Sequence, residues 1–270
     1  MKTFSFLILL LAMLAGGVAP IFAQTSSAAT WSGQIAYEVV RKIDPNSMRI
    51  VINGEQVKPG DPNFPSDIPD TRTFGQKTLI AGTFAKVNRE GENTAVRTMV
   101  TLGAAGPGPT QTSTAGRPFE EQVYVDLAAQ KSITVLTIGK DKEARTYRAE
   151  TSITRATDWK LTDQTKKIAG YVCRKATVPF RKETYTVWYT TDLPVTYSPI
   201  NELTPEAGVV LLIESSREQF RATKVSQDAV DIKDIQPTTA AETVSADRLA
   251  DLRQKALADF RQQLMMGDRN

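Results

Sequence analysis

Residues Trp159–Ala176 read W-K-L-T-D-Q-T-K-K-I-A-G-Y-V-C-R-K-A, which predicts extended chain on both sides of a polar turn. Trp159–Leu161 is short and extended, T-D-Q-T-K is the turn, and Lys167–Val178 is a strand candidate. The stretch also holds the only cysteine, Cys173, of a 270-residue chain that contains no histidine. It therefore predicts a β-rich fold and restricts the chemistry that this fold can perform.

Further strand candidates lie on both sides of this stretch. They cover residues 31–40, 48–52, 78–88, 95–102, 122–127, 132–138, 144–153, 183–190, 208–215, 218–225 and 229–235. Two segments rich in proline or glycine, 58–70 and 103–118, are expected to be loops. Because strands do not alternate with helices, a parallel sheet is excluded. We therefore expect a mainly β fold, a curved antiparallel sheet (half-barrel or open barrel-like) in a single domain over residues 24–237.

One amphipathic helix is expected in the C-terminal segment 238–270. Ser245 occupies an N-cap position and Asp247 lies in the first turn. An apolar stripe follows, formed by Leu249, Leu252, Ala256, Leu257, Phe260 and Leu264. We expect this helix to cover part of the concave side of the sheet, and the alternative is a helix that binds a partner or a membrane surface.

Residues 1–23 are typical of a cleaved signal peptide. Lys2 precedes the apolar run Phe4–Leu14, and Ala23 is a small residue before Gln24. Glycines and a proline interrupt the run before it reaches the length of a membrane span. We therefore expect an exported protein, periplasmic or associated with the outer membrane, with no transmembrane segment after cleavage. The net charge of +3 is close to neutral, so no nucleic-acid partner is expected.

The absence of histidine excludes Ser-His and Cys-His nucleophilic catalysis and the commonest zinc and copper ligand sets. A single cysteine also excludes an intramolecular disulfide. No D-x-[DN]-x-[DN]-G calcium loop occurs. These counts predict a protein without cofactor or metal, and they favour a protein that is not an enzyme.

Aromatic side chains and the lone thiol are the candidate binding residues. A strand rich in aromatic residues can line a ligand groove with flat apolar walls, although such a strand more often forms core. Cys173 is more typical of a small buried hydrophobe than of a reactive thiol. The candidates are Trp159, Tyr171, Cys173, Tyr185, Trp188 and Tyr189.

Carboxylates are the groups that remain for hydrolytic chemistry without histidine. The available acids are Glu120, Glu121, Asp126, Glu183, Asp192, Glu202 and Glu214. No spacing singles out two of them as a catalytic pair.

Several of these patches resemble the GLPGLI (Porph_ging) family. They are G-Q-I-A-Y-E-V from Gly33, the Trp159–Ala176 stretch, and T-V-W-Y-T-T-D-L-P-V followed by Pro199. In place of the family's G-L-P-G-L-I motif the chain has E-L-T-P-E-A-G-V-V-L-L-I-E, so it would be a divergent member. The resemblance implies a cell-envelope protein of Bacteroidetes type with no known reaction.

Three functional hypotheses follow. The first is a secreted, non-catalytic β protein that binds a small apolar ligand, a peptide, or an outer-membrane or envelope protein partner. The alternative is a carboxylate-dependent hydrolase that acts on glycans or other envelope substrates. The second alternative is a lipid or lipoprotein carrier, which requires an enclosed apolar cavity.

Overall fold

The computed structural model describes residues 31–44, 50–52, 55–62, 64, 70–90, 95–103 and 106–267. The signal peptide expected over residues 1–23 lies outside the described residues. None of the helices in the described ranges combines the length and the apolar character that crossing a bilayer requires.

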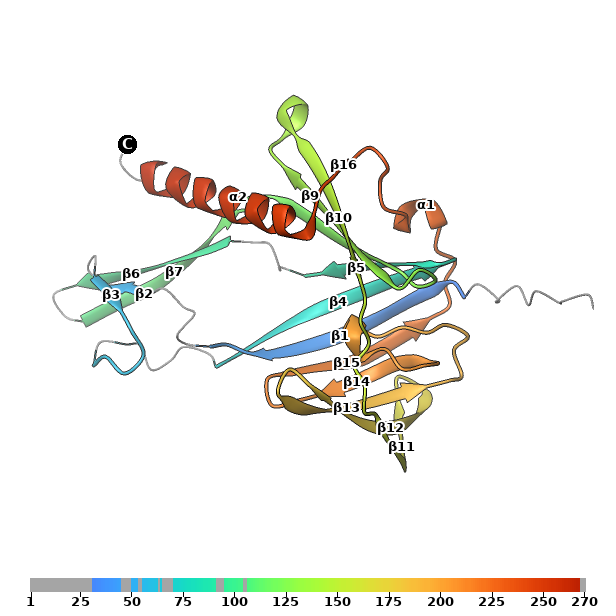
Figure 1. The fold of residues 1–270 in the computed structure, drawn as a ribbon. Coiled ribbons are helices and arrows are strands. Elements are labelled where there is room, and N and C mark those ends of the chain that lie inside the picture. Colours follow the sequence, from blue (N-terminus) through green and yellow to red (C-terminus); the bar gives the residue numbers. More distant parts are fainter. Residues whose placement is uncertain are drawn as a thin grey trace, which may run out of the picture.

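The described chain is mainly β and is organised around one open, curved 12-stranded sheet (Figure 1). In spatial order the strands are β11 (Lys160–Ile168), β12 (Tyr171–Phe180), β13 (Glu183–Thr190), β14 (Val209–Glu214), β15 (Glu218–Ser226), β1 (Gly33–Lys42), β4 (Thr71–Ala81), β5 (Phe84–Arg89), β8 (Glu120–Asp126), β9 (Lys131–Ile138), β10 (Arg145–Ser152) and β16 (Glu242–Thr243). Neighbouring strands are antiparallel except for the short β10–β16 pair. The predicted mainly β, antiparallel class is thus confirmed.

Smaller elements complete the fold. Two separate ribbons pair β2 (Ile50–Ile52) with β3 (Glu55–Val57), and β6 (Ala95–Gly103) with β7 (Gly106–Gly116). The helical elements are the 3₁₀ turns η2 (Asp141–Glu143) and η3 (Asn201–Leu203), the short α1 (Ile232–Ile235) and the long α2 (Ala246–Gly267).

The main core lies on one face of the sheet and is filled by the segment that joins β13 to β14. Leu193, Tyr197 and Leu203 of this connection are all buried. The Tyr197 hydroxyl lies 2.9 Å from Thr78 Oγ1, and Tyr37 donates a hydrogen bond of 2.8 Å to the Val210 carbonyl. Buried polar groups need partners, so the first hydrogen bond holds the connection against β4 and the second joins β1 to β14.

Helix α2 begins where its cap predicts. The Ser245 hydroxyl accepts a hydrogen bond of 3.2 Å from the Arg248 amide. Leu249 and Ala256 of the predicted stripe are buried in a second cluster with Phe119 of the segment before β8 and with Leu136 of β9. The helix therefore covers the β8–β10 part of the sheet (Figure 1).

Two predicted elements in the N-terminal half, one strand and one loop, are wrong. Residues 78–88 do not form one strand, because Gly82 (φ 59°) turns the chain between β4 and β5. The loop expected over 103–118 is instead largely β7, which pairs with β6. A two-stranded ribbon needs backbone donors on one edge only, so prolines are compatible with it.

Two further elements differ from the prediction in the C-terminal half. The expected polar turn T-D-Q-T-K is part of β11, and the chain reverses later, at Ala169 (φ 46°) and Gly170 (φ 93°). Positive φ at both positions is the geometry of a two-residue hairpin turn. The strand expected over 229–235 is instead the turn of helix α1, in which Asp231 accepts a hydrogen bond from the Lys233 amide.

Candidate functional site

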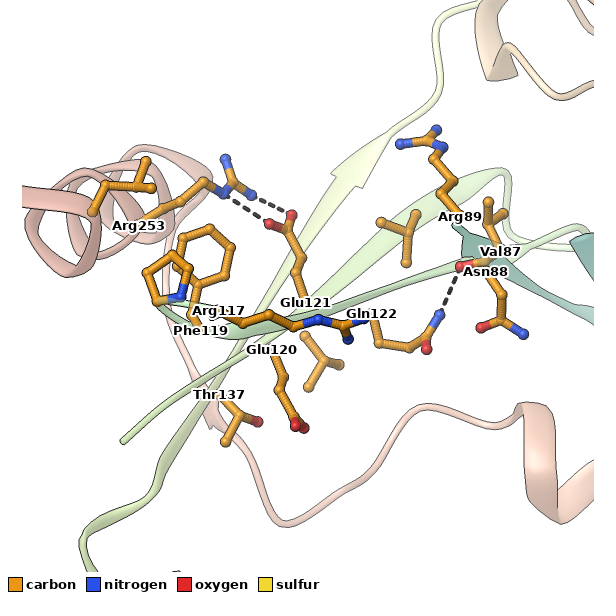
Figure 2. A pocket seen from close by; sticks show the side chains of 14 residues that line it. Val87, Asn88, Arg89, Arg117, Phe119, Glu120, Glu121, Gln122, Thr137 and Arg253 are labelled. Carbon is orange, nitrogen blue, oxygen red and sulfur yellow. Dashed lines mark hydrogen bonds and ion pairs between the residues drawn. The ribbon is translucent and has the colours of Figure 1, made fainter. Parts of the chain in front are cut away.

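A cavity of about 800 Å³ lies where β5, β8, β9 and α2 meet (Figure 2). Apolar side chains such as Val87, Phe119 and Leu257 form part of its wall. Its remaining wall is rich in charged and amide groups, which are Arg89, Arg117, Glu120, Glu121, Gln122 and Arg253. A concave site with both kinds of surface is typical of ligand binding.

The cavity exists because two neighbouring strands diverge. β5 and β8 pair only as far as Val87 opposite Val123. Beyond this point β5 continues beside β4 and ends at Arg89, whereas the first residues of β8 pair with β9. The Gln122 amide spans the divergence with a hydrogen bond of 2.7 Å to the Val87 carbonyl (Figure 2).

Adjacent acids of β8 contribute to different sides of this opening. Successive side chains of a strand point to opposite faces, so Glu121 shares the face of Val123 while Glu120 lies on the other face. Glu121 is bound by Arg253 of α2, whose Nε and Nη2 lie 2.9 Å and 2.5 Å from the two carboxylate oxygens. This bidentate pair holds the helix over the cavity.

Glu120 and Arg117 are the accessible charged groups of the cavity. Both side chains are exposed. Within the described part of the chain, neither makes a hydrogen bond or ion pair with another residue. They are therefore available to a ligand without the loss of an existing interaction.

Arg89 is held by a buried amide. Its Nε donates a hydrogen bond of 2.9 Å to Gln76 Oε1, and the two residues are directly opposite each other on β5 and β4. Gln76 is only 1% exposed. Burial raises the pKa of the nearby Tyr197 to about 12. Three neighbours lower this pKa in part: the hydrogen bond between Tyr197 and Thr78, the charge of Arg89, and the Gln76 amide. A polar chain therefore runs from the cavity wall into the core.

The six predicted binding residues lie elsewhere, in or against the main core. Cys173, Tyr185 and Trp188 are buried within it, and the other three pack against it half-buried. None of the six lines the cavity; they are Trp159, Tyr171, Cys173, Tyr185, Trp188 and Tyr189. Tyr185 thus belongs to the inner face of the sheet, whereas the Trp188 ring lies on the opposite face of β13, near the ammonium groups of Lys166 and Lys175.

Cys173 has the properties of a buried structural thiol. Its side chain is fully buried. Burial, followed by the negative charge of Asp192, raises the pKa of the thiol to about 11. Because the thiolate is the reactive form, this environment keeps the sulfur inert near neutral pH.

The carboxylates of the hydrolase alternative fall into separate groups. Only Glu120 and Glu121 line the cavity. Glu183 instead contacts the Ser216 hydroxyl, the main reason for its lowered pKa, and Glu214 accepts a hydrogen bond of 3.2 Å from Trp188 Nε1.

The arginines of the cavity were absent from the predicted site. Arg253 had a detectable signal, because it lies four residues after Leu249 and three before Ala256, on the apolar side of the helix. A cation at such a position indicates a buried or half-buried acid on the surface that the helix covers. Arg89 had no such signal, because its partner Gln76 is distant in sequence.

The family of N-glycanase peptide N-terminal domains matches residues 89–253, more than half of the chain. The chain belongs to this family. The match begins and ends at residues that line the cavity, Arg89 and Arg253.

Two solved structures of PNGF-II, in space groups P21 and C2, share the fold. They are 15% and 14% identical to this chain, with TM-scores of 0.51 and 0.52. Each alignment covers 84% of this chain but only 34% and 33% of the PNGF-II chains, so this chain spans about one third of their length. No curated protein matches the sequence.

Family membership corrects three expectations. The GLPGLI assignment is wrong, because it rested on short strand patches whose alternating aromatic and apolar residues are common to many β proteins. The expectations of a non-catalytic binding protein and of a protein that is not an enzyme are also contradicted, because the matching family is that of N-glycanase N-terminal domains. Of the predicted alternatives, the glycan-directed hydrolase fits this family better.

Proposed function

We propose that this chain acts on N-linked glycans of glycoproteins as an N-glycanase-like protein, and that the cavity between β5, β8, β9 and α2 engages the glycan. The observation that carries the proposal is the coincidence of the family match with the cavity, whose charged residues from Arg89 to Arg253 all lie within the matched range. A volume of about 800 Å³ is within the range of small-molecule sites.

The lining has the chemistry that a saccharide requires. Sugar hydroxyls donate to carboxylates and accept from guanidinium and amide groups, and the cavity contains all three kinds of group. Phe119 and the valines provide apolar surface for the ring faces of a sugar. The site is therefore suited to a polar ligand with apolar faces.

In this proposal the two acids of β8 have different roles. Glu121 is held in place by Arg253 and serves as a fixed hydrogen-bond acceptor for the substrate. Glu120 has an exposed side chain and serves as the acid–base group that hydrolysis requires. The division of roles thus follows from geometry, since Arg253 holds Glu121 in place and Glu120 is exposed.

Two further expectations belong to the proposal. We infer that the curved sheet is a half-barrel that supports the cavity at one end, and that residues 1–23 direct export, which would bring the protein to secreted glycoproteins. An envelope-protein partner stays a prediction.

The test is a release assay. Purified protein is incubated with a denatured glycoprotein that carries N-linked glycans, and freed glycans are identified by mass spectrometry. We expect release by the natural chain, a loss of at least about 100-fold in Glu120→Gln, and unchanged release in Glu242→Gln, whose carboxylate is exposed on β16 away from the cavity. Absence of release by the natural chain would overturn the proposal. Full release by Glu120→Gln would overturn the role assigned to Glu120.

A further inference from the structure

β8 has an unpaired backbone edge inside the cavity. In the sheet order β5 is the neighbour of β8 on this side, yet the pairing of the two strands ends at Val87 opposite Val123. The earlier residues of β8, from Glu120 onward, pair with β9 on the other side. Within the described ranges, no strand therefore occupies the β5-facing edge of β8 before Val123.

The backbone of Glu121 faces this edge. The Val87 carbonyl accepts a hydrogen bond of 2.7 Å from the Gln122 side chain, so this carbonyl points towards β8. In an antiparallel pair of this kind the two opposite residues exchange N–H and C=O groups, so those of Val123 point towards β5. The direction alternates along a strand, and the N–H and C=O of Glu121, two residues earlier, therefore point into the opening. No backbone group of the described residues bonds to them there.

The two faces of β8 beside this edge differ in chemistry. Figure 2 shows Glu121 projecting towards Arg253 of α2, whereas Glu120 projects to the other side together with Thr137. Thr137 of β9 is directly opposite Glu120, which places both on one face. A polypeptide lying along the edge would therefore present alternate side chains to α2 and to Glu120.

We infer that this edge of β8 binds the polypeptide that carries the N-glycan, as an added antiparallel strand in the opening between β5 and β8. The inference rests on the proposed function and specifies how its substrate is held. Backbone N–H and C=O groups require hydrogen-bond partners, and an unpaired strand edge binds an extended peptide through them. The cavity of about 800 Å³ provides the space beside the edge.

The spacing of the glycosylation signal fits this mode of binding. In Asn-X-Ser/Thr the asparagine and the hydroxyl residue are two positions apart, so an extended strand places both on one face. On the Glu120 face, the asparagine side chain and its glycan reach the proposed acid–base group. The central residue X then lies opposite Glu121 and exchanges backbone hydrogen bonds with it.

The test uses a hexapeptide with one Asn-Val-Thr signal whose asparagine carries a short N-glycan, and the same glycan without peptide. We expect isothermal titration calorimetry to give about tenfold tighter binding of the glycopeptide, the effect of one or two backbone hydrogen bonds. Replacing the N–H of the central valine by an ester oxygen should reduce this ratio about fivefold. An ester at the asparagine N–H, which points away from β8, is the matched control and should keep the ratio.

Variants of Glu121 separate its backbone from its carboxylate. Glu121→Ala and Glu121→Pro both remove the ion pair with Arg253, but only proline removes the backbone N–H. We expect the ratio of glycopeptide to glycan affinity to be kept in Glu121→Ala and to fall towards one in Glu121→Pro. The two variants should have similar melting temperatures, because proline is tolerated where the N–H of a strand has no partner.

Each outcome distinguishes this inference from the proposed function. Equal affinity for glycopeptide and glycan would overturn the binding of peptide at the edge while leaving glycan recognition intact. Equal effects of the two esters, or a ratio that is kept in Glu121→Pro, would also overturn it. A much lower melting temperature of Glu121→Pro than of Glu121→Ala would show that the N–H already has a partner, with the same consequence. Failure to bind either probe would overturn both the inference and the function on which it rests.

Discussion

Arg253 of α2 donates to both carboxylate oxygens of Glu121 on β8, although the two residues lie 132 positions apart in the chain. The pair joins the C-terminal helix to the sheet at the edge of the cavity (Figure 2). Its side chains are only 34% and 17% exposed, so solvent screens it less than a surface pair.

Removal of the Arg253 cation should destabilise the protein. Arg253→Met leaves the Glu121 carboxylate half-buried beneath the helix without its partner, so we expect the free energy of unfolding to fall by about 1–3 kcal/mol. Urea denaturation measures the change. The control Arg248→Met replaces an exposed arginine of the same helix and should cost less than about 0.5 kcal/mol. Equal losses in the two variants would contradict a structural role for the pair.

Two glycines with the same backbone conformation should respond differently to a methyl group. Gly208 (φ +98°) and Gly170 (φ +93°) both lie in the left-handed region. A Cβ at Gly208 would lie 2.4 Å from the Thr190 carbonyl oxygen, whereas nothing lies within 4 Å at Gly170. Gly170→Ala should cost about 1 kcal/mol of backbone strain, and Gly208→Ala about 1–3 kcal/mol more. Thermal unfolding of the two variants tests the difference, and similar melting temperatures would refute the clash.

The thiol of Cys173 should be unreactive in the folded protein. Burial raises its pKa to about 11, so little thiolate is present at pH 8. We expect iodoacetamide to label it only in urea concentrations that unfold the chain, as followed by mass spectrometry. The double variant Cys173→Ala/Arg174→Cys moves the thiol to an exposed neighbouring position and should be labelled rapidly in buffer. Rapid labelling of the native thiol would contradict the buried environment.

Stability should decline in alkaline solution. Folding raises the pKa of Cys173 from 9.0 to about 11 and that of Tyr197 from 10.0 to about 12, in both cases mainly through burial. The unfolded chain releases these protons first, so the stabilisation is complete below about pH 9 and is lost as pH rises towards 12. Urea denaturation between pH 7 and pH 11 measures the decline. Cys173→Ala and Tyr197→Phe should each flatten the profile, and a natural chain with constant stability up to pH 11 would contradict this origin.

The buried acid Glu218 should depend more on one arginine than on the other. Arg41 Nε lies 3.0 Å from its carboxylate and Arg181 Nη1 lies 3.5 Å away, with 39% and 56% of the two arginine side chains exposed. Arg41 also stacks on Phe74 and Phe220, each at 5.6 Å. Arg41→Met should therefore cost about 1–3 kcal/mol and Arg181→Met less than about 1 kcal/mol, measured by urea denaturation. The reverse order would show that Arg181 is the main partner.

The elements that were predicted well have strong local patterns. The expected strand at 183–190 coincides with β13 (Glu183–Thr190), because alternating β-branched and aromatic residues are typical of a pleated surface. The apolar run V-V-L-L-I is the fully buried core of β14. The helix beginning after Ser245 also followed from its cap and stripe.

The elements that were missed lack such patterns. β11 is exposed along nearly its whole length, so no apolar alternation distinguishes it from a turn. The connection between β13 and β14 has no regular secondary structure beyond η3, yet Leu193 and Tyr197 within it fill the core. Its burial depends on the sheet that surrounds it.

The sequence by itself determined that the chain forms an antiparallel β fold with one C-terminal helix, because residue periodicity and helix capping are properties of neighbouring residues. It also excluded histidine and disulfide chemistry through composition. Only the tertiary structure decided where the cavity lies. β5 and β8 separate after Val87 and Val123, and Arg253 then meets Glu121 from a distant helix. Such contacts depend on how strands and helices pack together, which no local pattern records.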